Sequence, residues 1–145
     1  MARLLHAPFL DVTVNPIPCP CGRTSANPEG QALPFDACCG PYHAGQPAPD
    51  AESLMRSRYS AFVLGDVPYL MATWHSTQRP AQLQPEVGAK WLGLQIKQHR
   101  IMGVSTAEVE FVARFRVGGK ATRQHELSRF LHEEGRWFYV DGDVL

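Results

Sequence analysis

The clearest hydrophobic pattern in the chain is a helical one that runs from Asp50 to Gly65. Apolar residues recur there mostly at spacings of three and four, which places them on one face of a helix: Leu54, Met55, Tyr59, Phe62 and Val63. Asp50 is a favourable N-cap residue, and glycine at position 65 commonly ends a helix. Asp66 and Pro68 then predict a second, shorter helix. Its apolar side carries Tyr69, Leu70 and Trp74.

After an irregular stretch at 75–87, the pattern changes to an alternation of apolar and polar residues. This period of two is typical of strands that are buried on one side. The predicted strands are Trp91–Ile96, Glu108–Val117, Gln124–Glu133 and Trp137–Val140. Gly118 and Gly119 predict a hairpin turn between the second and third of them. Two helices followed by an antiparallel meander indicate an α+β fold.

The chain before residue 50 has a different character. Residues 1–18 contain three prolines around an alternating stretch, Leu10–Val14, which predicts a short edge strand or an extended arm. Residues 19–49 are rich in proline and glycine and lack periodicity. We therefore expect an N-terminal arm (1–18), a small segment that needs a metal to fold (19–49) and a main domain (50–145).

Composition and charge narrow the possible functions. The chain has 14 basic and 14 acidic residues, so it offers no general attraction to nucleic acid or to an anionic membrane. No apolar run approaches the ~20 residues that span a bilayer. His6, Pro8 and Asp11 interrupt the apolar N-terminus before a signal-peptide core could form. We therefore expect a cytoplasmic, reducing location, where paired cysteines are more often metal ligands or redox groups than disulfides.

The four cysteines form two doublets, Cys19-Pro20-Cys21 and Cys38-Cys39. Four thiolates that close one loop suit a tetrahedral zinc ion, with each sulfur about 2.3 Å from the metal. A closed site of this kind has no open position for water, so we favour a structural Zn²⁺ over a catalytic one. Two alternatives stay open. One doublet could be a redox-active thiol pair, and His43 could replace one thiol ligand.

Polar and aromatic residues of the main domain are the other candidates. If the main domain holds a ligand between its sheet and its helices, we expect the wall and rim of that site to include Arg58, Tyr59, Trp74, His75, Arg114, Glu126, Ser128 and Phe130. Glu126, Ser128 and Phe130 share one strand face, which we take as the concave one. A buried Glu126 would need a cation or several hydrogen-bond donors.

The roles of two of these candidates stay open. His75 could be a general base or a hydrogen-bond donor to a bound ligand, because its unperturbed pKa is near neutrality. It could also be a capping or core residue. Arg58 lies two residues from Arg56, so the two arginines cannot form one phosphate clamp on a helix. We expect Arg56 to be solvated and Arg58 to be half-buried, drawn either into the cavity or into an ion pair with Glu126 or Asp141.

Several segments resemble the bacterial YchJ family. They are Leu54–Phe62, Ala72–His75, Trp91–Leu94, Val109–Arg116, His125–Phe130 and Gly135–Gly142. The cysteine doublets, with Gly22 and with Gly40–Gly45, resemble the SEC-C motif, a small metal-binding tail of the bacterial translocation ATPase. The resemblance covers roughly residues 19–142 and implies a SEC-C element joined to a cone-shaped domain like nuclear transport factor 2 (NTF2). Residues 23–35 make a longer loop than this motif usually has, and residues 1–18 precede its usual start.

The resemblance implies no particular activity, and two functions stay open. In the first, the chain is a non-catalytic binding or adaptor protein, because SEC-C tails of the translocation ATPase serve as interaction modules for protein partners. In the second, it is a small-molecule binder or enzyme that uses the cone cavity. A filled cone would favour the first, and an open cavity in which His75 and Glu126 converge would favour the second.

Overall fold

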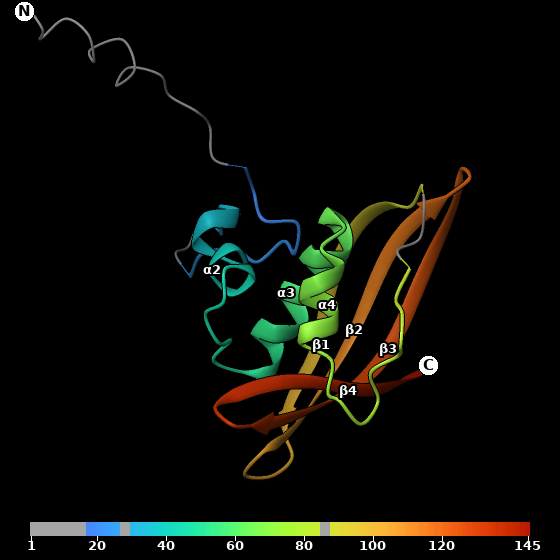
Figure 1. Cartoon of the computed structure of the whole chain (residues 1–145). Helices are drawn as coiled ribbons and strands as arrows, with labels where there is room; N and C mark the ends of the chain where they lie inside the picture. Colours follow the sequence, from blue (N-terminus) through green and yellow to red (C-terminus); the bar gives the residue numbers. More distant parts are fainter. Residues whose placement is uncertain (1–16, 27–29, 85–87) are drawn as a thin grey trace, which may run out of the picture.

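The computed structural model describes residues 17–26, 30–84 and 88–145. The described chain forms a small cysteine-bearing segment, two helices and a bent sheet. The helices cover one face of this sheet (Figure 1). The elements in chain order are η2 (Phe35–Ala37), α2 (Gly40–His43), α3 (Ala51–Leu64), α4 (Val67–Ala72), β1 (Lys90–Ile101), β2 (Thr106–Val117), β3 (Lys120–Glu133) and β4 (Arg136–Val144). The α+β prediction is confirmed. The predicted strand at 10–14 lies outside the described residues.

Both predicted helices form, and their caps explain where they start. The Asp50 side chain accepts a hydrogen bond from the Ser53 amide at 2.7 Å, and Asp66 does the same for the Tyr69 amide at 3.2 Å. Gly65 ends α3 in the left-handed conformation, with φ of 74°. One detail of the prediction was wrong. Helix α4 ends at Ala72, so Trp74 lies beyond it.

The sheet has the order β1-β2-β3-β4, and every neighbouring pair is antiparallel. The strands are longer than the alternating pattern indicated, because Val117 already pairs with Lys120 across the hairpin turn. Register shifts interrupt the β1–β2 and β3–β4 ladders, and such bulges bend a sheet. The result is a long curved surface with α3 against its inner face.

Sheet alternation decides which residues meet the helices. Val109, Phe111 and Ala113 of β2 are buried together with Phe130 of β3 and with the inner side chains of α3. Among the described residues, no helix is long and apolar enough to cross a membrane.

Candidate metal centre and cone cavity

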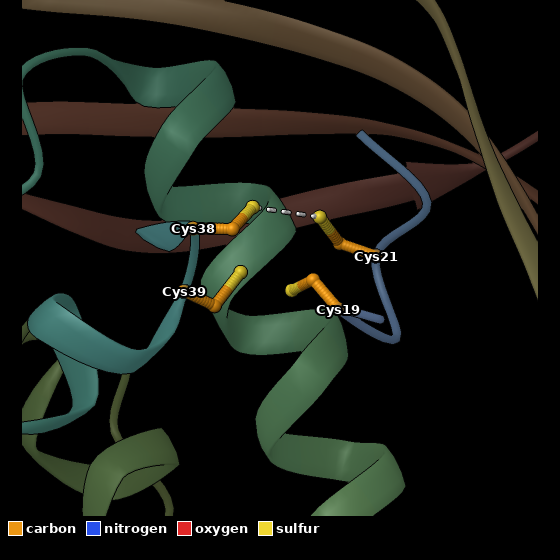
Figure 2. A group of neighbouring side chains, drawn as sticks. All are labelled: Cys19, Cys21, Cys38 and Cys39. Carbon is orange, nitrogen blue, oxygen red and sulfur yellow. Dashed lines mark hydrogen bonds between the residues drawn. The ribbon is translucent and has the colours of Figure 1, made fainter. Parts of the chain in front are cut away.

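The four cysteines come together at one point (Figure 2). Their sulfur atoms all lie within 4.8 Å of one another, and the Cys21 and Cys38 sulfurs are 3.6 Å apart. Tetrahedral coordination with bonds of about 2.3 Å would separate the sulfurs by about 3.7 Å. The arrangement therefore suits one tetrahedral ion.

Tight backbone turns bring these sulfurs together. The Gly22 amide donates to the Cys19 carbonyl at 3.1 Å, which closes the first doublet into a turn. In the second doublet, Cys39 is the N-cap of α2 and Cys38 has an unusual backbone conformation, so the chain bends between them. Gly40 makes this bend possible, because a Cβ atom there would lie 2.9 Å from the Phe35 carbonyl oxygen.

The protonation of the cluster shows why a cation suits it. Hydrogen bonds from the Cys21 and Cys39 thiols lower the pKa of Cys19. The hydrogen bond to Cys19 raises the pKa of Cys39, and burial, together with the neighbouring Cys21, raises the pKa of Cys38 to about 12. Four adjacent thiolates would therefore repel one another in a buried site. A divalent ion removes this repulsion, and soft sulfur ligands select zinc or iron.

Arg56 lies beside the cluster, and Arg23 shares its carboxylate partner Glu52. Arg56 donates to the Cys21 carbonyl at 3.2 Å and to Glu52 at 2.9 Å, and Arg23 donates to Glu52 at 3.2 Å. Although burial opposes its charge, the hydrogen bond to Glu52 raises the pKa of Arg56. The expectation of a solvated Arg56 was wrong, because its side chain is only 16% exposed and holds the first doublet against α3.

His43 does not join the four converging cysteines. Its Nε2 atom is hydrogen-bonded to the Ser57 carbonyl at 2.8 Å, and its ring packs against Tyr69 and Phe35. The group of converging ligand atoms consists of the four cysteines. The geometry thus gives no support to the replacement of a thiol by His43.

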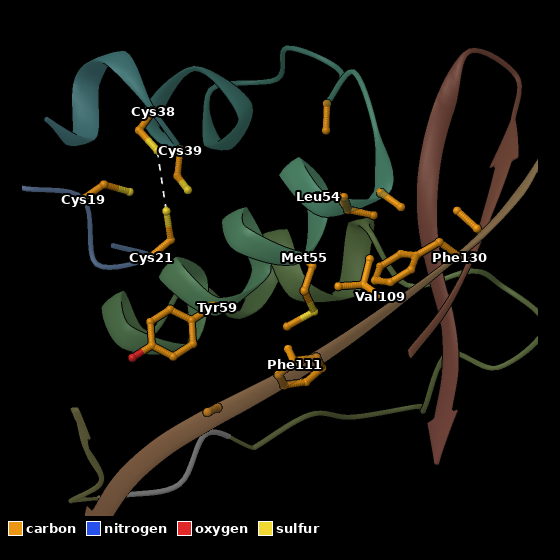
Figure 3. Packing of buried hydrophobic residues seen from close by; sticks show 14 residues of the cluster. Cys19, Cys21, Cys38, Cys39, Leu54, Met55, Tyr59, Val109, Phe111 and Phe130 are labelled. Carbon is orange, nitrogen blue, oxygen red and sulfur yellow. Dashed lines mark hydrogen bonds between the residues drawn. The ribbon is translucent and has the colours of Figure 1, made fainter. Parts of the chain in front are cut away.

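The cysteine segment is part of the main core (Figure 3). All four cysteines are at most 8% exposed, and they belong to the same buried cluster as Leu54, Tyr59 and Val109. The Cys19 sulfur also lies 3.5 Å from the Ser60 hydroxyl of α3. A metal ion bound here would consequently stabilise the packing of the cysteine segment against α3.

A cavity of about 390 Å³ lies between the helices and the sheet, so the cone is not filled. Five of the eight predicted wall residues line it: Arg58, Tyr59, Trp74, Glu126 and Ser128. The rest of the wall is largely apolar and aromatic, and it includes Met55, Phe62, Leu83, Gln84, Trp91, Phe111, Ala113, Phe115, Gln124 and Tyr139.

Arg58 is the most unusual group in this wall. It is 3% exposed, and its Nη1 atom donates to the Leu70 carbonyl at 2.8 Å and to the Thr73 hydroxyl at 2.6 Å. The rings of Trp74 and Tyr139 lie 5.3 Å and 4.7 Å from its guanidinium carbon. Burial lowers the pKa of Arg58 to about 10, which still leaves it charged at neutral pH.

No ion pair of Arg58 occurs in the part of the chain that the structure describes. The predicted partner Asp141 instead accepts a hydrogen bond from Arg129 at 2.6 Å. The other predicted partner, Glu126, favours the charge on Arg58 without a direct salt bridge. The alternative of an ion pair with Glu126 or Asp141 was therefore wrong, and so was the half-buried exposure. The other alternative, in which Arg58 turns into the cavity, agrees with the structure, where the side chain lies in the cavity wall and donates to the Leu70 carbonyl and the Thr73 hydroxyl.

Glu126 is held by three donors. Ser128 and Tyr139 donate to its Oε2 atom at 2.8 Å and 3.3 Å, and Gln124 donates to Oε1 at 3.1 Å. This is the several-donor environment that a buried carboxylate requires. Gly142 provides the space, because a Cβ atom there would lie 2.8 Å from the carboxylate carbon.

Three predicted wall residues lie elsewhere. His75 is buried away from the lining and contacts Thr77 at 2.7 Å and Glu133 at 3.2 Å, so it does not converge with Glu126. Arg114 is exposed, because its neighbours on β2 occupy the inner face. Phe130 is a core residue that packs against the Tyr139 ring.

The prediction missed Tyr139, Gln124 and several aromatic wall residues. Alternation from Glu126 along β3 would have found Gln124. Tyr139 required knowledge of the β3–β4 register, in which it pairs with Phe130.

Comparison with known proteins gives consistent results. The family model of the middle NTF2-like domain of YchJ matches residues 50–142. A UPF0225 protein of Polaromonas naphthalenivorans is 63% identical, with 87% of this chain and 96% of the relative covered. A UPF0225 protein of Methylibium petroleiphilum is 54% identical, with 89% and 90% covered.

Two solved structures share the fold. One is the crystal structure of a SEC-C motif containing protein from Psychrobacter arcticus, with a TM-score of 0.73, 32% identity, and 88% of this chain and 82% of that chain covered. The other is the solution structure of a SEC-C motif containing protein from Rhodopseudomonas palustris, with a TM-score of 0.72, 33% identity, and 89% and 99% covered.

Proposed function

This chain belongs to the YchJ family, and we propose that its NTF2-like domain binds a small organic molecule in the cone cavity. A structural metal ion would stabilise the neighbouring cysteine segment. The single observation that carries this proposal is the presence of Arg58 and Glu126, a buried cation and a buried carboxylate, in the wall of a largely apolar cavity.

Burial of a charged group costs free energy, so the presence of Arg58 and Glu126 in the cavity wall needs an explanation. Apolar side chains of similar volume would often serve the stability of the fold as well or better. Charged groups that are held inside a cavity are a common feature of ligand sites. The cavity volume also falls in the range of about 300–1,000 Å³ that is typical of small-molecule pockets.

A second hollow of about 480 Å³ is less suited to this role. It lies between the cysteine segment, α4 and β4, and is lined by residues that include His43, Asp66 and Arg136. Arg136 is exposed and donates to the Gly45 carbonyl at 3.1 Å, and His43 is bound to the Ser57 carbonyl. Its polar groups are therefore engaged in joining the two parts of the chain.

For the metal, we infer Zn²⁺ in a structural role in a reducing, cytoplasmic location. Four converging sulfurs complete a tetrahedral shell and leave no position for a substrate. A redox pair of thiols would not require all four sulfurs to meet. The adaptor role of the SEC-C element stays a prediction, which a search for a protein partner would test.

Amide NMR spectra of the full-length protein, recorded with a collection of small organic fragments, test the cavity. We expect shifts at Phe111, Ala113 and Ser128, and none in the cysteine segment. Gln124→Phe would narrow the cavity and weaken these shifts. Arg123→Phe is the matched control, because its side chain points to the other face of β3. If no fragment shifts the cavity residues, the proposed function is wrong.

A further inference from the structure

We propose that the cavity selects an aromatic carboxylic acid, with the carboxylate held by Arg58 and the ring held among the aromatic wall residues. This inference rests on the proposed small-molecule function and adds the chemical class of the ligand.

The hydrogen-bonding capacity at the polar end of the cavity is unbalanced. Both hydrogen bonds of Arg58 start from Nη1, although a guanidinium carries five N–H donors. Glu126, in contrast, already accepts from Gln124, Ser128 and Tyr139. The capacity that is left over is mainly that of a donor, so a ligand that accepts hydrogen bonds fits best.

The charge of Arg58 also favours an anionic ligand. Arg58 is charged and almost fully buried, and in the described part of the chain it forms no direct ion pair. A carboxylate on the ligand would provide a directly bonded counter-charge through short, charge-assisted hydrogen bonds. A cationic ligand would face repulsion from Arg58 and would find the acceptors of Glu126 largely occupied.

The shape of the site favours a planar acid. The Trp74 and Tyr139 rings lie near the guanidinium, which leaves its edge as the direction of approach. The edge of a guanidinium binds a planar carboxylate through two parallel hydrogen bonds, a bidentate arrangement. Beyond this end, Trp91 and Phe115 lie 5.0 Å apart between ring centres, and Phe111 adds a further ring to the wall. Such a wall suits an aromatic body.

The test compares biphenylcarboxylate with its neutral analogue biphenylcarboxamide by calorimetric titration of the full-length protein. We expect the amide to bind about 10- to 100-fold more weakly, because it loses hydrogen bonds to a charged partner. In Arg58→Met the acid should lose this advantage. The matched control Arg114→Met removes an exposed arginine outside the cavity and should keep it.

The possible outcomes separate this inference from the proposed function. Equal affinity of acid and amide in the wild type would overturn the carboxylate inference and leave the cavity function in place. Binding of neutral fragments in the absence of acid binding would do the same. If neither these two compounds nor the fragment collection reaches the cavity, the proposed function itself fails. The wild-type comparison decides the matter even if Arg58→Met does not fold.

Discussion

The Arg58 guanidinium carbon lies 4.7 Å from the centre of the Tyr139 ring. The hydroxyl of the same tyrosine donates to Glu126 at 3.3 Å, so one side chain contacts both buried charges of the cavity. Burial, followed by the nearby charge of Glu126, raises the pKa of Tyr139 and keeps the hydroxyl protonated as a donor. Tyr139 therefore joins the cation of α3 to the carboxylate of β3.

This arrangement predicts different effects for two substitutions at position 139. Tyr139→Phe removes one hydrogen bond and should lower the free energy of unfolding by about 1 kcal/mol. Tyr139→Leu also removes the ring beneath Arg58 and should cost a further ~1 kcal/mol or more. Urea denaturation measures both. Equal losses for the two variants would show that the ring contact contributes nothing.

A second prediction concerns pH. Burial lowers the pKa of Arg58 from 12.5 to about 10, so the unfolded chain binds more protons than the folded one between these values. The destabilisation by buried Arg58 is complete below about pH 10 and declines above it. The stability of the wild type relative to Arg58→Met should thus be constant near neutral pH and rise above about pH 10, by about 1 kcal/mol per pH unit.

The groups that face Arg58 do not obscure this test. They are Tyr69, Tyr139 and Glu126. Burial raises the pKa of both tyrosines, and both are present in the wild type and in Arg58→Met, so their own titration largely cancels in the comparison. A relative stability that falls with pH in this window would contradict the assignment.

Gly142 gives a third prediction. A Cβ atom at this position would meet the Glu126 carboxylate, so Gly142→Ala should destabilise the fold by about 1–3 kcal/mol through overpacking. In a Glu126→Ala background the space is free, and the same substitution should cost much less. A double-mutant cycle by urea denaturation measures the difference, which should exceed about 0.5 kcal/mol. Additive effects would show that the two residues do not compete for the space.

The sequence was informative where a local rule decides the structure. Capping residues placed the starts of α3 and α4, and alternation placed Glu126 and Ser128 on the inner face of β3. It was uninformative where distant segments decide. His75 follows a tryptophan that bridges to Tyr139, and this contact directs His75 toward Glu133 and away from the cavity. The surroundings of Arg58 depend on the end of α4, which no periodicity reveals.

A fourth prediction concerns the metal. The purified protein should carry about one zinc ion per chain, because four converging thiolates complete one tetrahedral shell. Cys38→Ser and Cys39→Ser should each lose most of it, as measured by elemental analysis. His43→Ala is the matched control and should retain the ion, since His43 binds the Ser57 carbonyl. Loss of zinc in this variant alone would show that histidine is a ligand.

Removal of the ion should also separate the two parts of the chain. Metal binding to a loop-rich segment is folding free energy for that segment, so a chelator should expose residues 19–49 to proteolysis. The helices and sheet should stay folded, because the β2 and β3 side chains that pack against α3 do not depend on the ion. The shared core nevertheless predicts a lower melting temperature for the stripped protein, as Cys21 and Cys39 lose their close packing near α3. Loss of the whole far-ultraviolet signal on chelation would mean that residues 50–145 are not an independent domain.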